Sequence, residues 1–489
     1  MAKLKNIIKQ LAQADYLSIY ENLLDSSADK SAHLLKAMRE RHLSDSKIMD
    51  ELKVNPNAYY TLRSRLNQKI EEHLLQLMEN PRTDILKKVA NINEMIFTKK
   101  RAISVATLQK LEKELIDYDL SNELMVVYKH LKKLHINTPD FFTYSQLYNR
   151  HIAYMLAIDK AEDLMGEYFK KFAFYSLGGD ETDKFELTLL HNELQNVAQM
   201  YQSHRLYVYK TCVEIFHRLF ILPEPEQTTL EPIEEMFESV QKILNSYVLD
   251  STYYHLNLVL DYLRLLFFHY YKLHRKSEKM YQDVNDSLFL LLSNYGFFTY
   301  PSQFFSTKIE RALRLNMEAE LYAENKEMFV AYENDPSELP RYLNYMTYRA
   351  LCCYYVEKYE EAAKWINTAL NSVSLKKYPH ALMELKALLA LQYCMMRDQD
   401  LFNQLVHSTQ RIIRIVEKDR SEHIVYFIKI IKLIIGGTKT NRKGRLKSLV
   451  TKMANCPTHL FSPTKLIRLD DDFADRLLEE KTTNTKAKN

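Results

Sequence analysis

The stretch ALCCYYVEKYEEAAKWINTAL, residues 350–370, contains two short amphipathic helices joined by a turn near Glu357 and Lys358. Apolar and small residues recur in it at intervals of three and four, the spacing of one face of an α-helix. Small residues let two antiparallel helices approach closely, and larger ones fill the gaps beside them. This stretch therefore predicts a packed helix pair. The residues expected to pack are Ala350, Cys353, Tyr359, Ala362, Ile366 and Ala369.

The order of small and aromatic residues from Ala350 to Ala369 resembles one unit of the tetratricopeptide repeat (TPR) family. Arg349 and Glu357 stand where that family commonly has a leucine and a glycine. The resemblance implies a TPR-like α-solenoid of antiparallel helix pairs. The concave surface of such a solenoid usually binds peptides or helices of partner proteins.

Weaker copies of the second-helix spacing occur at three other places. They are Ala161, Met165 and Tyr168; Ser277, Tyr281 and Val284; and Leu401, Leu405 and Ser408. If Ala161, Ser277 and Ala362 are equivalent, they lie 116 and 85 residues apart. These separations fit three and two units of roughly forty residues, the range of helix-pair repeats. We therefore expect repeats of variable length.

The glycine content restricts the fold class. Only 7 of the 489 residues are glycine, against an average of about 7% of positions. Tight hairpins and phosphate-binding loops need glycine for positive φ angles and close backbone approach. The composition therefore favours an all-α fold and disfavours β-rich folds and most nucleotide enzymes built on glycine loops.

Prolines and polar clusters, such as Asn80-Pro81 and Thr138-Pro139, divide the chain into segments long enough for one or two helices each. We expect five parts on this basis. They are an N-terminal helical module (residues 1–80), connecting helices (81–138), TPR-like repeats (139–435), a C-terminal helical segment (436–480) and a disordered tail (481–489).

The N-terminal module contains two helical segments on either side of a turn expected at Asn55-Pro56-Asn57. This pattern resembles the helix-turn-helix of the transcription-factor and sigma-factor families, with Ser46 to Leu52 as the supporting helix and Asn57 to Ile70 as the recognition helix. Arginine can bind guanine edges and asparagine can bind adenine. The candidate contacts to nucleic acid are Asn57, Tyr60, Thr61, Arg63, Ser64, Arg65, Asn67 and Lys69.

Three features depart from that family pattern, and one is the negative charge of Glu71-Glu72 at the far end of the recognition helix. Met49 stands where a small residue usually lets the helices approach, and Lys53 replaces a turn glycine. A helical hairpin that caps the repeats explains the same sequence. Both interpretations, DNA contact and structural capping, stay open at this point.

No catalytic or metal-binding motif is present. The sequence contains no GxxxxGK[ST], GxGxxG, HExxH or GxSxG motif and no metal-type cluster of cysteine and histidine. The run from Gly436 to Gly444 is basic but lacks phosphate-loop spacing, so we expect a mobile loop there. Asp470-Asp471-Asp472 is interpreted as a helix start. We expect no catalytic residue, no cofactor and no metal.

We infer the cellular compartment from the most apolar stretches and from the spacing of the cysteines. The most apolar stretches, 256–271 and 424–435, are interrupted by charged residues, so no membrane span is expected. Five cysteines without disulfide spacing indicate a reducing, cytoplasmic environment. The net charge of +4 is too small to indicate nucleic-acid binding by itself.

We expect a non-enzymatic scaffold that binds a protein or peptide partner on the concave face of its repeats. The alternative is a DNA-binding transcriptional regulator that uses the N-terminal helix-turn-helix, with the repeats as a sensor or dimerisation domain. The identity of the partner and the oligomeric state are left open.

Overall fold

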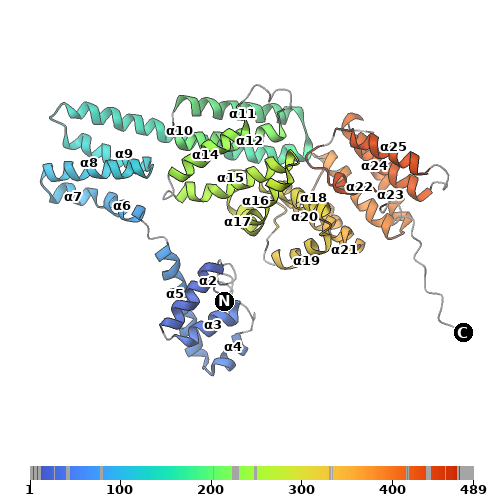
Figure 1. Cartoon of the computed structure of the whole chain (residues 1–489), viewed down its shortest axis with the longest axis horizontal. Helices are drawn as coiled ribbons and strands as arrows, with labels where there is room; N and C mark the ends of the chain where they lie inside the picture. Colours follow the sequence, from blue (N-terminus) through green and yellow to red (C-terminus); the bar gives the residue numbers. More distant parts are fainter. Residues whose placement is uncertain are drawn as a thin grey trace. The chain divides into compact units, whose positions relative to one another are not determined.

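The computed structural model describes residues 4, 8, 11, 13–26, 28–39, 45–77, 81–201, 203–222, 231–246, 251–329, 332, 334–414, 416, 418–436, 442–457, 459–470 and 473. Every regular element in these residues is a helix, which confirms the expected all-α fold (Figure 1). Contacts divide the chain into two compact units, Met1–His151 and Ile152–Asn489. No helix in the described residues combines the length and apolar character that crossing a bilayer requires.

The first helices of the N-terminal unit share a separate apolar core, in which Ile19, Leu34, Ile48 and Leu66 are buried. These helices are α2 (Gln13–Asp25), α3 (Asp29–Arg39), α4 (Asp45–Leu52) and α5 (Pro56–Leu77). Helix α5 packs on α2 and α3. This group of helices is therefore held together by its own side chains.

The turn between α4 and α5 lies earlier than the sequence predicts. Pro56 and Asn57 are already the first helical residues of α5, so the expected turn at these positions is wrong. The chain reverses at Lys53, whose φ is 50°. Asn55 caps α5, because its Oδ1 accepts a hydrogen bond from the Ala58 backbone N–H at 2.8 Å. Asparagine is a favoured N-cap, and proline fits the first helical position without wasting a donor.

The remaining helices of the N-terminal unit have a second core of their own, which includes Leu108, Val127 and Leu131. These helices are α6 (Pro81–Ala90), α7 (Ile92–Thr98), α8 (Arg101–Asp117) and α9 (Ser121–Leu134). Tyr144 and Tyr148, near the start of α10 (Asp140–Gly178), pack against this core. The division between the two units falls inside α10.

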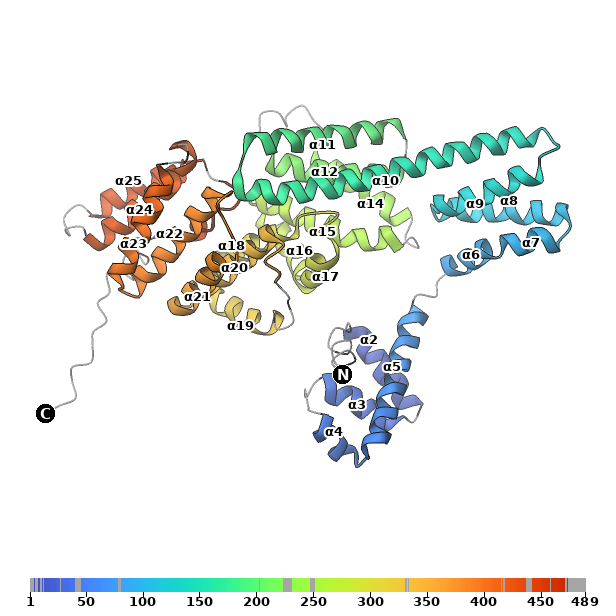
Figure 2. The ribbon, with the colours of Figure 1, turned by 180° about the vertical axis from the view of Figure 1, so that it is seen from behind.

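The helices of the C-terminal unit surround one continuous apolar core that extends from Ala157 to Phe473. They are α10, α11 (Glu181–Met200), α12 (His204–Phe220), α14 (Ile233–Ser246), α15 (Ser251–Tyr270), α16 (His274–Asp286), α17 (Leu288–Asn294), η1 (Pro301–Gln303), α18 (Phe304–Leu315), α19 (Glu318–Met328), α20 (Leu339–Tyr355), α21 (Tyr359–Ser372), α22 (Pro379–Met395), α23 (Gln399–Ile413), α24 (Lys418–Gly436), α25 (Arg442–Ala454) and η2 (Pro463–Leu466). Consecutive helices pack as neighbours, and Figure 2 shows α20 to α23 side by side from behind.

One turn recurs in the C-terminal unit. Lys272, Asn316, Glu357 and Arg397 all have φ between 55° and 67°, and they follow one another at intervals of 44, 41 and 40 residues. In each turn the next residue donates its backbone N–H to the carbonyl five residues back, at 2.7 to 2.9 Å. This bond closes the end of a helix, and the next helix begins one residue later. Four successive helix pairs are thus joined in the same way: α15–α16, α18–α19, α20–α21 and α22–α23.

The pair α20–α21 contains the residues expected to pack. Ala350, Cys353, Ala362, Ile366 and Ala369 are each at most 1% exposed. Tyr359 is half-buried at the start of α21, and its ring centroid lies 5.9 Å from that of Tyr354. The small residues therefore occupy the interior of the pair.

Two other expectations are wrong. In α23 the buried residues are Phe402, Val406 and Thr409, whereas Leu401 is exposed. The expected set of Leu401, Leu405 and Ser408 is therefore one residue out of register.

The loop expected from Gly436 to Gly444 is also wrong at both ends of the run. Gly436 ends α24, and Arg442, Lys443 and Gly444 begin α25, while residues 437–441 lie outside the described residues. In the acidic run, Asp470 Oδ1 accepts the Phe473 N–H at 2.8 Å, as expected at a helix start. Asp471, Asp472 and the tail 481–489 lie outside the described residues.

Candidate functional site

The candidate nucleic-acid contacts all lie on α5, but not on one face. Tyr60, Thr61, Ser64, Arg65 and Lys69 are exposed and follow one side of the helix. Asn67 is half-buried, and the side chain of Asn57 lies outside the described residues. The structure therefore brings five of the expected residues together on an outer face with two cations.

Arg63 is separated from this face. It is 9% exposed, and its guanidinium carbon lies 5.9 Å from the centre of the Tyr59 ring, which is also buried. A cation over an aromatic ring is attracted by the ring's negative face. Arg63 therefore belongs to the packed side of α5 rather than to its exposed surface.

The most unusual feature of the C-terminal unit is an irregular segment after α25. Residues 459–470, here called the C-terminal strap, contain one short 3-10 helix, η2, and otherwise no regular structure. The strap is nevertheless largely buried: Phe461, Pro463, Thr464 and Ile467 are each less than 9% exposed. It lies against helices that precede it by many residues, and η2 contacts α18 and α22.

Glu384 on α22 is the central anchor of the strap. The Thr464 N–H donates to Glu384 Oε2 at 3.0 Å, and the Thr464 hydroxyl donates to the same oxygen at 2.7 Å. Glu384 is fully buried, and burial raises its pKa to about 7 although the bonds from Thr464 favour the charged form. His423 on α24 places Nε2 3.1 Å from Thr464 Oγ1, and burial lowers the pKa of this histidine to about 4.

Tyr355 and Arg468 form a second anchor. The Tyr355 hydroxyl donates to the Leu466 carbonyl at 2.5 Å and accepts the Arg468 N–H at 3.0 Å. The Arg468 guanidinium pairs with Glu318 at 3.1 Å and donates to the Leu313 carbonyl. The strap's backbone is thus held by side chains of the helices, which satisfy groups that a regular element would pair internally.

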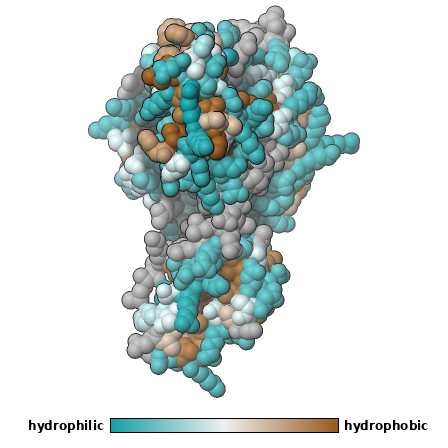
Figure 3. Space-filling model, turned by 90° about the vertical axis from the view of Figure 1, so that its left-hand side faces the viewer, coloured by the Kyte–Doolittle hydropathy of each residue, from teal (hydrophilic) through white to brown (hydrophobic). Residues whose placement is uncertain are grey.

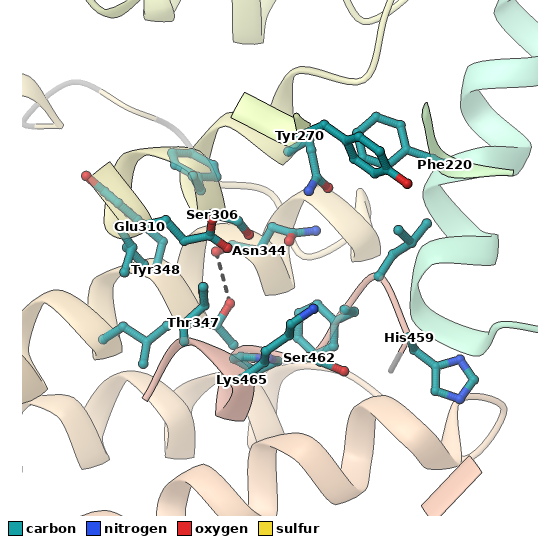
Figure 4. Close-up of a pocket in the computed structure, with 18 of the residues that line it drawn as sticks. Phe220, Tyr270, Ser306, Glu310, Asn344, Thr347, Tyr348, His459, Ser462 and Lys465 are labelled. Carbon is teal, nitrogen blue, oxygen red and sulfur yellow. Dashed lines mark hydrogen bonds between the residues drawn. The ribbon is translucent and has the colours of Figure 1, made fainter. Parts of the chain in front are cut away.

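A cavity of about 340 Å³ lies beside the strap (Figure 4). Ser306 and Glu310 of α18 line it, together with Asn344 of α20 and with Ser462 and Lys465 of the strap. Glu310 Oε2 also lies 2.6 Å from His269 Nε2. The lining therefore mixes hydroxyl, amide and charged groups with aromatic rings such as Tyr270 and Tyr348.

The geometry around His380 does not activate a nucleophile. His380 Nε2 lies 3.2 Å from the Phe461 carbonyl oxygen, 3.5 Å from Ser462 Oγ and 3.7 Å from Glu384 Oε1. A nitrogen that faces a carbonyl oxygen carries the proton, so it is not a base toward Ser462. A catalytic relay also needs the carboxylate on the other ring nitrogen. In the described parts of the chain, no group of three His, Cys, Asp or Glu side chains is arranged to hold a metal ion.

Two further buried polar clusters stabilise the helices. Glu214 accepts hydrogen bonds from Gln195 at 2.9 Å and from Arg218 at 2.5 Å, and it contacts His191. Burial alone would raise the pKa of Glu214, but His191 and Arg218 outweigh it and lower the pKa to about 2. Lys308 is fully buried and donates to Asn285 at 2.6 Å and to Glu324 at 2.8 Å.

Sequence reasoning missed these clusters and the strap. The sequence around Glu384, PHALMELKALLALQYCM, is that of an ordinary buried helix with one acidic residue. A charged residue within an otherwise apolar run is the one signal that could have drawn attention to it, because such groups are rarely buried without a partner.

Exposed apolar side chains mark another surface, in the N-terminal unit. Phe97 is 89% exposed, Phe142 71% and Ile136 66%, and they lie at the end of α7, near the start of α10 and in the link between α9 and α10. Figure 3 shows hydrophobic residues among hydrophilic ones on the side where these helices lie.

Comparisons with protein-family models, with curated proteins and with solved structures find no match to this chain.

Proposed function

We propose that the protein is a non-enzymatic scaffold, a TPR-like α-solenoid that holds a segment of a partner protein against its repeat helices. The observation that carries this proposal is the recurrence of one turn at Lys272, Asn316, Glu357 and Arg397, at intervals of 40 to 44 residues. Stacked helix pairs bury a continuous core and leave an extended surface suited to peptides and helices.

The surroundings of the strap support this function. Helices α18, α20 and α22 already hold an irregular segment through Glu384, Tyr355 and the carbonyl of Leu313. The cavity beside that segment has polar and aromatic walls. We therefore place the partner site on these helices.

The test is capture of a partner by the full-length protein from an extract of cells that make it, followed by cross-linking and mass spectrometry. Ser306 is half-buried on the cavity wall, so Ser306→Arg places a long charged side chain in the cavity. Thr368→Arg introduces the same side chain at an exposed position of α21 and is the matched control.

We expect the wild type and Thr368→Arg to retain the same partner, and Ser306→Arg to retain at least about tenfold less of it. Circular dichroism checks that both variants keep their helical content. A partner retained equally by all three proteins would place the binding surface elsewhere, and the absence of any specific partner would contradict the scaffold.

The outer face of α5 favours a second candidate function, contact with DNA. Arg65 and Lys69 are both exposed there, beside the hydroxyls of Tyr60, Thr61 and Ser64. Such cations neutralise phosphates and release counterions, so binding weakens as salt rises. In this interpretation the N-terminal module is a helix-turn-helix, and the repeats are a sensor or dimerisation domain.

Electrophoretic mobility of duplex DNA at low salt, with the full-length protein, tests this candidate. The double change Arg65→Ala and Lys69→Ala is expected to weaken binding and to reduce the salt dependence by about two phosphate contacts. The matched control is Lys87→Ala with Lys110→Ala, which removes two exposed cations elsewhere. No shift by the wild type at low salt would remove this candidate.

A further inference from the structure

The C-terminal strap contacts the helices in the manner of a bound peptide. Two of its backbone N–H groups donate to the helices, that of Phe461 to the Ser176 carbonyl at 3.0 Å and that of Thr464 to Glu384 at 3.0 Å, while those of Lys465 and Ile467 donate within the strap. The Arg468 N–H goes to the Tyr355 hydroxyl. Regular elements pair such groups within themselves, whereas an extended ligand depends on its receptor for them.

Most side chains of the strap are buried or half-buried. Phe461, Thr464 and Ile467 are buried, and Arg468 pairs with Glu318. Lys465 between them is exposed. The surface under the strap therefore accepts one aromatic residue, one hydroxyl residue after a proline, one aliphatic residue and one arginine.

The strap does not fill its surroundings. The cavity of about 340 Å³ remains beside Ser462 and Lys465, and its opposite wall is formed by Ser306 and Asn344. This cavity is partly open at the surface, so a bound segment could enter it. A segment with bulkier side chains at the positions of Ser462 and Lys465 would make contacts that the strap lacks.

The burial of Glu384, the central anchor of the strap, also has a free-energy cost that opposes docking of the strap. The Glu384 carboxylate is fully buried where the strap docks, and burial raises its pKa, whereas the bonds from Thr464 act in the opposite direction. Removing a carboxylate from water is costly, and the two bonds from Thr464 only partly offset that cost. Release of the strap would return water to Glu384, so release costs less than the number of hydrogen bonds suggests.

We propose that the C-terminal strap is an internal ligand: it occupies the partner site of the repeat helices, and a partner segment of the same chemistry binds there by displacing it. That chemistry is an aromatic residue, a Ser-Pro-Thr turn, an aliphatic residue and an arginine. This inference rests on the proposed scaffold function and adds to it the class of partner and the regulation of the site.

The experiment uses the synthetic peptide HLFSPTKLIRL, the sequence of residues 459–469, labelled with fluorescein. Its binding to the full-length protein is measured by fluorescence anisotropy. The wild type is compared with Thr464→Val plus Arg468→Ala, which removes the hydroxyl bond to Glu384 and the pair with Glu318. Thr368→Ala, at an exposed position of α21 that belongs neither to the strap nor to the cavity lining, is the control.

We expect the double variant to bind the peptide at least about tenfold more tightly than the wild type and Thr368→Ala do, and a scrambled peptide not to bind. Hydrogen exchange of the strap should accelerate at least about tenfold in the double variant, while peptides from α20 and α21 keep their protection. If the double variant loses its helical circular dichroism, the single change Arg468→Ala, at a half-buried position, replaces it in the same comparison.

Two outcomes would overturn the proposal. One is a strap that exchanges faster without any gain in peptide binding, because the vacated surface would then not be a peptide site. The other is a strap whose exchange does not change, because it would then be a fixed part of the fold. In either case a partner captured by the wild type and lost in Ser306→Arg would leave the scaffold function standing.

Discussion

The helix pairs α4–α5 and α20–α21 are each joined by a turn of the same type, but they differ in how much of their surface is buried by neighbouring helices. Lys53 and Glu357 both have positive φ, and the next residue in each pair donates its N–H to the carbonyl five residues back. Almost every residue of α20 from Tyr342 to Tyr354 is buried, whereas α5 keeps one outer face exposed. The turn therefore sets the local path of the chain, whereas packing against neighbouring helices determines which side chains stay exposed.

The largest contrast is expected from truncation of a buried side chain. Ile366 is fully buried in α21, so Ile366→Ala should lower the free energy of unfolding by about 2–5 kcal/mol through lost burial and a residual cavity. The exposed Gln68 of α5 is the control. Gln68→Ala should change the free energy of unfolding by less than about 0.5 kcal/mol. Urea denaturation followed by circular dichroism measures both. Equal effects would mean that the two pairs are not covered differently.

The second-largest effect is expected from the buried carboxylate of Glu384 on α22. Glu384 has a pKa of about 7 when folded and about 4.5 when unfolded, so the folded state binds more protons between these values. Stability should therefore fall as pH rises from 4.5 through 7, by roughly 3 kcal/mol from this group. Glu384→Gln keeps the shape and removes the charge, so this contribution should vanish. Urea denaturation at pH 5 and pH 8 checks it.

Only the difference between the wild type and Glu384→Gln is diagnostic, because His423 titrates in the opposite sense. Burial lowers the pKa of His423 to about 4, so its contribution to stability is lost as pH falls below about 6.5. Parallel pH profiles for the two proteins would show that Glu384 is not buried as a titrating acid.

The third contrast lies within α5. Arg63 packs over Tyr59, whereas Arg65 is exposed. We expect Arg63→Ala to destabilise the N-terminal module by about 1–2 kcal/mol, since it removes packing of the buried stem as well as the cation over the ring. Arg65→Ala should have an effect below about 0.5 kcal/mol. Hydrogen exchange of peptides from α2, α3 and α5 reports the difference, and equal exchange in the two variants would contradict the assigned positions.

The smallest effect tests the shared turn itself. A residue with a side chain is strained in the left-handed backbone conformation at positive φ, whereas glycine is not. Glu357→Gly and Lys53→Gly should each raise stability by about 0.5–1 kcal/mol, which thermal unfolding can detect. A gain at one position and a loss at the other would show that the two turns only look alike.

The helical class and the interior of α20–α21 could be predicted because they follow from local spacing. Ala350, Ala362 and Ala369 are small and regularly placed, and their burial is visible in the sequence pattern. The register of α23 was less certain: Leu401 and Phe402 are both apolar, and only the neighbouring helix decides that Phe402 is buried. Spacing identifies a face but does not choose between adjacent apolar residues.

The candidate site could not be predicted in the same way. The strap has no period of two or 3.6, so no pattern distinguishes residues 459–470 from an exposed tail. Thr464 and Glu384 are 80 residues apart, and their contact depends on the path of several intervening helices. The turn near Glu357 was predicted, but its counterparts at Lys272 and Arg397 were not recognised, because these residues occupy positions where glycine would have signalled a helix end.

The distance along the chain between Glu384 and Thr464 also orders events during translation. The ribosome makes α10 to α22 before it makes the strap, and a gap of 80 residues corresponds to about 4–16 s at about 5–20 residues per second. If a partner displaces the strap as proposed, that interval is one in which Glu384 and Tyr355 have been made and the strap has not, so a partner segment has no internal competitor for them.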